Sequence, residues 1–298
     1  MNQGTLFIVY SKLLLTAVFW GGTFVAGRII AGRVGPFSAA FLRFVCASAC
    51  LLYLVYSSEK KFPLVQKSHL LPLILLGLTG VFTYNILFFK GLQYINAGRA
   101  SLIIANNPVF ITLFAAILFK ERLTFLRVMG IAFSVFGAII VVTRGNLTGI
   151  VQEGVGWGEI LIFGCVASWV AYSLIGKVVM SGKRLSPLIS VTYSSLIGAL
   201  ALFPMACIEG VFRNVSSYSV ADWGSLVYLG VFGTVLGFVW YYEGINAIGP
   251  MKAGQFINFV PISAVLLAFL ILQEPITLSL LIGGVFVIGG VILTNVKL

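Results

Sequence analysis

Side chains suited to acid–base or metal chemistry are almost missing from this 298-residue sequence. It contains one histidine, His69, and one aspartate, Asp222, and only 9% of its residues are charged. An intramembrane aspartyl protease needs two aspartates, a zinc protease needs paired histidines, and a serine nucleophile needs a base within reach. A glycine-rich phosphate loop ending in Lys and Ser or Thr is also lacking. The sequence therefore predicts no enzyme.

Cysteine usage and charge give no sign of a cofactor or of nucleic acid. Cys46, Cys50, Cys165 and Cys207 lie in apolar segments and lack the paired spacing of a metal site or redox motif. The formal net charge is +11, but the basic residues are scattered among the ends of apolar segments and form no stripe. No cofactor, no metal and no nucleic-acid partner are expected.

Apolar residues dominate what is present. They make up 60% of the chain, and the mean hydropathy is +1.08, whereas about a quarter of an ordinary soluble domain is charged. Since a membrane helix needs roughly 20 apolar residues, we predict an all-α membrane protein with ten transmembrane helices in a lipid bilayer. The predicted spans are residues 8–30, 36–56, 70–92, 97–119, 124–143, 157–179, 187–208, 224–247, 250–272 and 276–296. The first is expected to be a spanning helix and not a cleaved signal peptide.

The second half of the sequence repeats the first at an offset of 153 positions. Residues of the same type recur as the pairs Gly91 and Gly244, Ala100 and Ala253, Pro108 and Pro261, Glu121 and Glu274, Thr124 and Thr277, Gly130 and Gly283, and Gly137 and Gly290. We predict two repeats, residues 1–143 and 157–298, joined by a linker at 144–156. Because five helices per repeat is an odd number, the second repeat enters the membrane from the opposite face, and the repeats are inverted. Such duplication is the usual plan of a secondary transporter.

The basic residues also predict an orientation. Most of the 19 Lys and Arg residues fall in connectors on the side that would hold both termini, although Arg28 and Arg33 fall on the other side. Short loops rich in Lys and Arg stay in the cytoplasm. Both termini are therefore predicted to be cytoplasmic.

Amide side chains accompany a proline in two of the predicted helices. Asn106 and Asn107 precede Pro108 in the fourth helix, and two amides precede Pro261 in the ninth. Proline removes a backbone donor, and interrupted helices at matching positions of two repeats point to a binding site. The alternative is a packing kink whose amides are satisfied by neighbouring helices. The amide candidates for substrate binding are Asn106, Asn107, Gln255 and Asn258.

Four aromatic residues complete the predicted substrate site. Trp20 and Trp169 are approximate counterparts in the first and sixth helices, at an offset of 149 positions, and Tyr84 and Tyr241 lie in aromatic stretches of the third and eighth. Trp and Tyr often mark the membrane interface, but Trp20 and Trp169 lie deeper in their spans. For these two residues, helix packing is the competing interpretation.

Ionisable residues inside a span are costly and are weighed one by one. Arg43 is interpreted either as a contact to a substrate anion or as a structural cation bonded to carbonyl groups. Glu243 is the coupling candidate and would carry protons or cations. The alternative is that Glu243 lies at the membrane interface and reaches the cytoplasm with its carboxylate. Glu121 and Glu274 precede helix starts, where a carboxylate meets the positive helix end, and a folding role is expected for both.

The spacing of these motifs resembles the drug/metabolite transporter superfamily, EamA type, over essentially the full length. Each half carries Pro, then Glu-x-hydrophobic-Thr, then Gly: Pro108, Glu121, Leu123, Thr124, Gly130, Gly137 and Pro261, Glu274, Ile276, Thr277, Gly283, Gly290. Pro275 stands where the first half has Arg122, a departure that affects one helix start. The resemblance implies a cavity lined by helices 1, 3, 4, 6, 8 and 9, alternating access, and frequently export across a bacterial inner membrane.

The expected function is that of a permease for a small organic metabolite, such as an amino acid or a related solute, in the cell membrane. A non-transporting membrane scaffold or lipid-handling protein on the same fold stays open as the alternative. The sequence leaves undecided the substrate, the direction of transport, the energy source, and the choice between a monomer and a homodimer.

Overall fold

All regular structure in the computed structural model is helical. The structure describes residues 3–60, 65–119, 124–143, 145, 156–180, 185–248, 253–254 and 256–295. Within those residues it contains no strand, only an isolated bridge between Ala31 and Val34. The all-α class predicted from the composition is confirmed.

Six helical segments among the described residues are long and apolar enough to cross a membrane. They are Thr5–Ile30, Pro36–Ser58, Lys67–Tyr94, Trp157–Met180, Pro187–Ile208 and Val220–Ile248. Shorter apolar helices cover Phe125–Val141, Phe256–Leu272 and Leu278–Gly290. Since the faces of many helices expose large apolar side chains, the chain is a multi-pass membrane protein.

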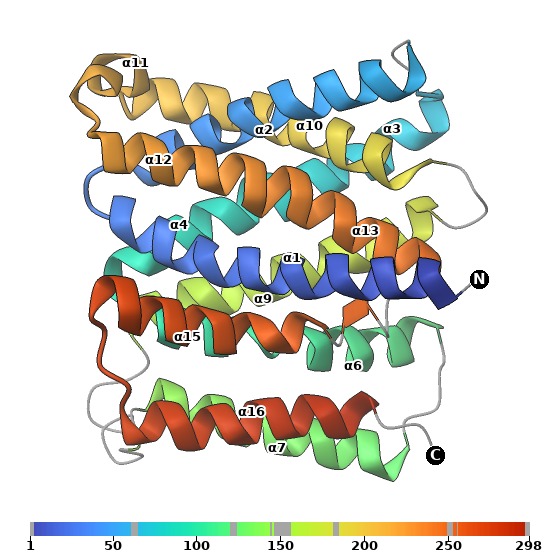
Figure 1. Cartoon of the computed structure of the whole chain (residues 1–298), viewed down its shortest axis with the longest axis vertical. Helices are drawn as coiled ribbons and strands as arrows, with labels where there is room; N and C mark the ends of the chain where they lie inside the picture. The colour runs from blue at the N-terminus through green and yellow to red at the C-terminus, as the bar shows by residue number, and fades with distance from the viewer. Residues whose placement is uncertain are drawn as a thin grey trace.

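The helices follow the predicted spans closely. In chain order they are α1 (Gln3–Ile30), α2 (Pro36–Glu59), α3 (Lys67–Leu76), η1 (Gly77–Thr83), α4 (Tyr84–Tyr94), α5 (Ala97–Ile104), α6 (Asn107–Phe119), α7 (Phe125–Val142), α9 (Trp157–Met180), α10 (Pro187–Ile208), α11 (Val211–Asn214), η3 (Val215–Ser217), α12 (Val220–Tyr228), η4 (Leu229–Leu236), α13 (Gly237–Ile248), η5 (Phe256–Asn258), α15 (Phe259–Leu272) and α16 (Leu278–Asn295). The long helices run side by side, and both termini lie at the same end of the molecule (Figure 1). We call this the terminal end and the opposite one the distal end.

Helix starts are set by residues that the sequence makes recognisable. Pro36 and Pro187 occupy the first positions of α2 and α10, where a missing backbone N–H costs nothing. The hydroxyl of Thr124 accepts a hydrogen bond from the backbone N–H of Arg127 at the start of α7. Ser219 and Asp222 form a reciprocal capping box at the start of α12. The single aspartate of the chain thus caps the start of a helix.

Two helices are interrupted where the amide–proline motifs predicted a break. A turn at Ala105 and Asn106 separates α5 from α6. In the second half, the short 3₁₀ segment η5 precedes α15, which begins at Phe259, two residues before Pro261. The interruption of the fourth predicted helix is therefore confirmed, and the ninth also begins irregularly.

Two other helices carry π-helical segments that the sequence did not predict. η1 covers residues 77–83 and η4 covers residues 229–236, so 77–83 shifted by 153 positions falls on 230–236. A π segment widens the helix and releases backbone carbonyl groups from the regular α pattern. Such segments often accompany functional sites.

Contacts made by equivalent glycines repeat between the halves. Gly91 packs against Ile162, and Gly244, 153 positions later, packs against Leu13, 149 positions before Ile162. Gly77 faces the carbonyl oxygen of Ser194 in the same way that Gly230 faces that of Arg43. The offset is therefore 153 in the third and eighth predicted helices, 151 in the second and seventh, and 149 in the first and sixth.

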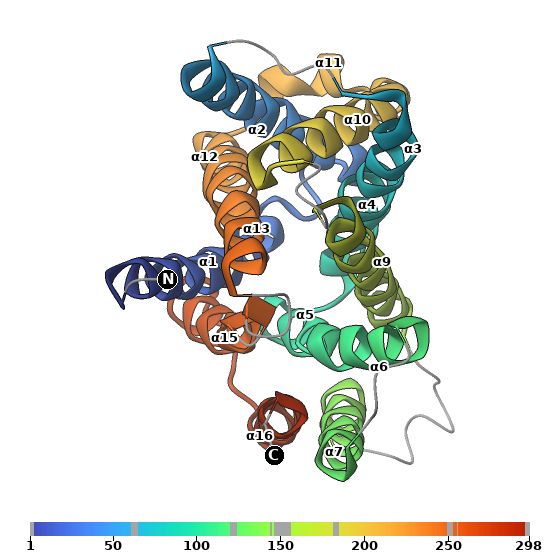
Figure 2. The same ribbon diagram turned by 90° about the vertical axis from the view of Figure 1, so that its right-hand side faces the viewer.

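The helices α7 and α16 form a separate pair. In the end-on view they lie against each other below the other helices, which surround the middle of the molecule (Figure 2). Their contact is made at glycines: Gly137 faces the carbonyl oxygen of Gly283, and Gly290 faces that of Gly130. Small residues allow close approach of helix backbones in membranes.

The expectation for Glu274 needs a correction. Its carboxylate oxygens accept hydrogen bonds from the backbone N–H groups of Ala97 and Gly98, at 3.1 and 3.3 Å, at the start of α5. Thr277 caps the helix that follows Glu274 by accepting from the N–H of Leu280, so the carboxylate is free to serve a helix of the other half. The carboxylate of Glu274 does meet the positive end of a helix, but that helix is α5 and not α16. Glu121 lies outside the described residues.

Candidate functional site

The four predicted aromatic residues meet in one cluster. The rings of Trp20 and Trp169 lie edge to face with centroids 5.4 Å apart. Tyr84 lies 5.3 Å from Trp169, and Tyr241 lies 5.2 Å from Trp20. Trp20 is fixed further because its Nε1 donates to the carbonyl oxygen of Gly233, in η4, at 3.0 Å. The pairing of the two tryptophans in the sequence thus corresponds to a direct contact in space.

A small cavity of about 40 Å³ lies beside this cluster. Its lining residues are Trp20, Thr23, Phe24, Arg43, Tyr84, Phe88, Ile104, Asn107, Trp169, Phe238, Ile257 and Val260. They come from α1, α4, α5, α6, α9, α13, η5 and α15, the helices that the resemblance assigned to a cavity, and in addition from α2 through Arg43. The cavity lies between the two halves, at the interruption of α5 and α6 and near the start of α15.

Arg43 is the charged residue of this site. Only 4% of it is exposed. Its Nε donates to the hydroxyl of Thr234 at 2.9 Å and its Nη1 donates to Oδ1 of Asn85 at 2.8 Å. The guanidinium carbon lies 5.3 Å from the ring centroid of Phe44. All three of these partners are neutral, so nothing in this set of contacts balances the charge of Arg43.

The partners of Arg43 are held by the π segments. The amide nitrogen of Asn85, which follows η1, donates to the carbonyl oxygens of Gly80 and Val81 at 3.3 and 2.8 Å. The hydroxyl of Thr234, within η4, donates to the carbonyl oxygen of Leu229 at 3.1 Å. The carbonyl groups inside the π segments thus fix the direction in which both side chains accept, and so hold the guanidinium of Arg43.

The predicted amides have different environments. Asn106 is satisfied: its Nδ2 donates to the carbonyl oxygens of Leu102 and Ile103, and its Oδ1 accepts from the hydroxyl of Ser134 on α7 at 2.9 Å. It does not line the cavity described above. Asn107 does, and its Oδ1 is buried without a hydrogen-bond partner among the described residues.

The amides of the ninth predicted helix are less directly connected with the cavity than Asn107 of the fourth. Oδ1 of Asn258 is also buried without a partner among the described residues, but the cavity is lined there by the neighbouring Ile257 and by Val260. Gln255 lies outside the described residues. Asn107 is therefore the amide that the geometry connects most directly with the cavity.

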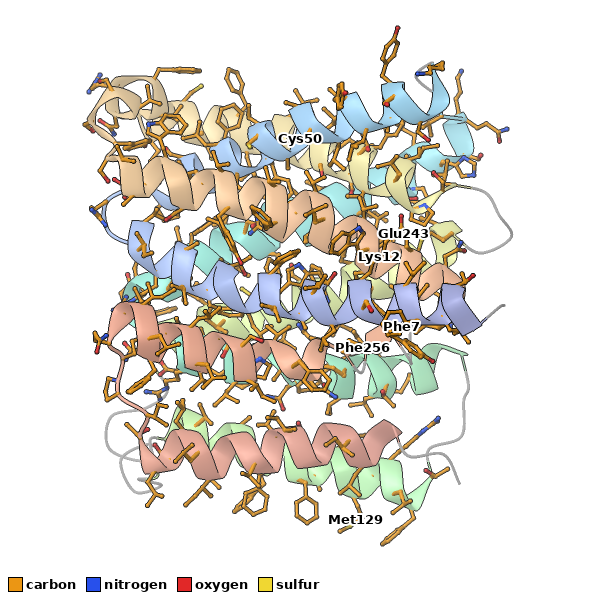
Figure 3. The ribbon with its side chains drawn as sticks, viewed as in Figure 1. Phe7, Lys12, Cys50, Met129, Glu243 and Phe256 are labelled. Carbon is orange, nitrogen blue, oxygen red and sulfur yellow. The ribbon has the colours of Figure 1, made fainter. Side chains whose placement is uncertain are left out.

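The coupling candidate Glu243 lies apart from the cavity. Its Oε2 pairs with Nζ of Lys12 at 2.8 Å, and the side chains are 41% and 35% exposed. The pair joins α13 to α1 towards the terminal end (Figure 3). Of the two interpretations from the sequence, this position fits the interfacial one directly, and a role in coupling remains a prediction. A half-exposed ion pair contributes about 0–1 kcal/mol to stability.

Several site residues were not among the sequence candidates. Thr23, Ile104 and Val260 give no signal in a sequence this rich in small and apolar residues. Asn85 and Thr234 could have been found, because polar side chains within an apolar span must meet a polar group. The distances to Arg43 could not be foreseen, since they depend on the π segments.

Comparison with protein-family models gives the same result for both halves. The EamA-like transporter family matches residues 7–143 and again residues 156–296. The two matches cover nearly the whole chain and leave out residues 144–155, all but the last residue of the predicted linker.

Relatives and a solved structure match over nearly the full length. The chain is 32% identical to the "Uncharacterized transporter YyaM" of Bacillus subtilis over 284 residues, 95% of this chain and 92% of that protein. It is 28% identical to the "Probable terminal-alkyne amino-acid exporter" of Streptantibioticus cattleyicolor, with the same coverage. A solved crystal structure with 18% identity superposes with a TM-score of 0.64, covering 94% of this chain and 98% of the other. This last likeness concerns the fold alone.

Proposed function

Because the chain belongs to the EamA-like transporter family, we propose that it is a secondary transporter for a small organic metabolite, an amino acid or a related solute. The observation that carries this proposal is the cavity between the halves, where Arg43 and Asn107 face aromatic rings. A mostly apolar site with a few polar groups is the usual design for binding a small solute. The relative named as an amino-acid exporter supports the same substrate class.

The proposed architecture is ten transmembrane helices in two inverted repeats of five, residues 1–143 and 157–298. The repeated glycine contacts and the double match to one family model support it. The pseudo-two-fold axis would lie in the membrane plane and pass near the cavity. Each half then supplies one π segment and one interrupted helix to the site.

The proposed mechanism is alternating access. Sites for small molecules enclose about 300–1,000 Å³, whereas this cavity has about 40 Å³, room for a water molecule or two. A solute can therefore enter only if helices lining the cavity separate. Rocking of the repeats about this site would open it to one side of the membrane at a time.

Reporter fusions test the orientation. We expect a fusion after Leu298 to report the cytoplasm and a fusion within residues 215–220, at the distal end, to report the outside of a bacterial inner membrane. The physical reason is the Lys and Arg bias of the loops together with termini at one end of the molecule. A common location for the two fusions would exclude the inverted arrangement.

Counterflow in proteoliposomes tests the function. Vesicles loaded with an unlabelled solute should accumulate the same labelled solute when they contain the protein, and vesicles without protein should not. The probes are amino acids, nucleosides and neutral metabolites, each measured separately. If none accumulates, the non-transporting scaffold or lipid-handling protein becomes the better account.

We propose further that coupling to protons, where it occurs, involves Glu243. Protonation would release Lys12 and loosen α1 from α13 at the terminal end. Glu243→Gln should then flatten the pH dependence of net solute flux while preserving exchange of labelled for unlabelled solute, which requires no net proton movement. An unchanged pH profile would leave exchange or facilitated diffusion as the mechanism.

A further inference from the structure

We propose that Arg43 binds the carboxylate of the transported solute, and that the solute is a zwitterion whose ammonium group meets Asn107. This inference rests on the proposed transport function and deepens it by naming the substrate class. It chooses between the two interpretations of Arg43 that the sequence left open.

The first argument is that Arg43 lacks an internal counter-ion. Every carboxylate whose side chain the structure describes is engaged elsewhere: Glu159 with Arg99, Glu209 with the N–H groups of Phe37 and Ser38, Asp222 with Ser219 and Arg33, Glu243 with Lys12, and Glu274 with the start of α5. A buried cation at membrane depth is costly unless an anion or a polar cavity compensates it. Among the described residues, the compensation for Arg43 comes only from neutral groups and the cavity.

The second argument is that the guanidinium keeps donors for a ligand. It carries five N–H groups, of which one on Nε and one on Nη1 are used by Thr234 and Asn85. Among the described residues the structure gives Nη2 no partner. Because these two bonds fix the plane of the guanidinium at the cavity wall, the remaining donors are preorganised for a bidentate carboxylate.

The third argument comes from the duplication. The carbonyl oxygen of Ser194 takes the same place against Gly77 that the carbonyl oxygen of Arg43 takes against Gly230. Ser194 is fully buried, and its hydroxyl donates to the carbonyl oxygen of Val191 in its own helix. The packing of this helix against its π segment is therefore achieved with a small neutral residue, and the fold does not require an arginine there.

The opposite wall supplies the group for the ammonium. Oδ1 of Asn107, a residue only 2% exposed, lies in the same cavity without a hydrogen-bond partner among the described residues. An amide oxygen accepts and cannot donate, so it suits an N–H group of the solute. The indole rings of Trp20 and Trp169 then leave an apolar surface for the solute's side chain.

The test compares solutes that differ at the carboxylate. Labelled amino acids are first screened by counterflow, and the one that moves fastest is competed with its unlabelled acid and with its unlabelled amide, which lacks the carboxylate. We expect the amide to compete at least about thirtyfold more weakly, the low end of the cost of removing one partner of a buried charge pair. Arg43→Gln should weaken competition by the acid by the same factor, so that acid and amide compete equally well.

Two further variants separate binding from folding. Arg43→Lys keeps the positive charge but loses the planar guanidinium that can bind a carboxylate through two N–H groups, and it should retain part of the preference for the acid. Arg33→Gln removes an exposed arginine at the distal end and should leave the ratio of acid to amide unchanged. If Arg43→Gln fails to give folded protein, the comparison of acid and amide in the wild type and in Arg43→Lys still decides.

The outcomes distinguish this inference from the function it rests on. If the amide competes as well as the acid, or if Arg43→Gln lowers the melting temperature but leaves the preference unchanged, Arg43 is a structural cation and the inference is wrong. If no amino acid is transported but a labelled nucleoside or organic cation is, the proposed transport function is supported and the proposed zwitterionic substrate is wrong. If nothing moves, the proposed function itself fails.

Discussion

Asn107→Leu is expected to lower counterflow of the transported solute by about ten- to a hundredfold while leaving the amount of folded protein unchanged. Oδ1 of Asn107 is buried in the cavity without a hydrogen-bond partner among the described residues, so in the empty protein leucine removes an acceptor that none of those residues satisfies. In the loaded protein it removes a hydrogen bond to a charged group, about 1.5–3 kcal/mol. The measurement is initial counterflow per unit of monodisperse protein.

Asn106→Leu is the matched variant, one residue earlier, and the opposite result is expected. Its side chain bonds to Leu102, Ile103 and Ser134, so leucine would leave the hydroxyl of Ser134 without its acceptor and remove the link from the helix break to α7. Folded protein and activity should therefore fall together. If Asn107→Leu also lost folded protein in proportion to activity, both amides would only pack helices, and the site would lie elsewhere.

The sequence predicted the helices well because membrane spans have a strong and simple signal. Apolar runs of the required length, ended by prolines, glycines and charged residues, located the segments that the structure shows as helices. The interruption before Pro108 was also predictable, since proline removes a defined hydrogen bond. These features depend on neighbouring residues alone.

The site was predicted only in part because it depends on distant contacts. Trp20, Tyr84, Asn107 and Trp169 do line one cavity, and their polarity or size at membrane depth marked them. The π segments gave no such signal, and they hold the partners of Arg43. The choice between Asn106 and Asn107 could not be made either, because it depends on which face of a broken helix meets Ser134.

The charged residue in the lining of the cavity comes from the first half of the chain. Arg43 lies on α2, and the equivalent position in the second half is Ser194. A duplicated fold with identical halves would place equal groups on both sides of the axis. Because one position carries the guanidinium, a zwitterion bound as proposed would be oriented, with its carboxylate towards α2 and its ammonium group towards α6.

Two substitutions at neighbouring glycines of α16 are expected to differ in their effect on stability: Gly290→Ala should destabilise the protein, and Gly289→Ala should not. A methyl group on Gly290 would lie 2.5 Å from the carbonyl oxygen of Gly130 and closer still to the backbone nitrogen of Ser134, whereas one on Gly289 would meet nothing within 4 Å. The obstacles at Gly290 are backbone atoms of α7, which cannot rotate away. Gly290→Ala must therefore push the two helices apart.

The neighbouring glycine controls for the effect of alanine on the helix itself. Alanine favours a helix over glycine by up to about 1 kcal/mol, so Gly289→Ala should raise the melting temperature in detergent or leave it unchanged. Gly290→Ala gains the same local preference but loses about 1–3 kcal/mol to overpacking, and it weakens the van der Waals packing that helps to hold helices together in a membrane. Its melting temperature should fall below that of the wild type. Equal melting temperatures for the two variants would mean that α7 and α16 do not pack at these glycines, and would remove the direct contact between the last helices of the two proposed repeats.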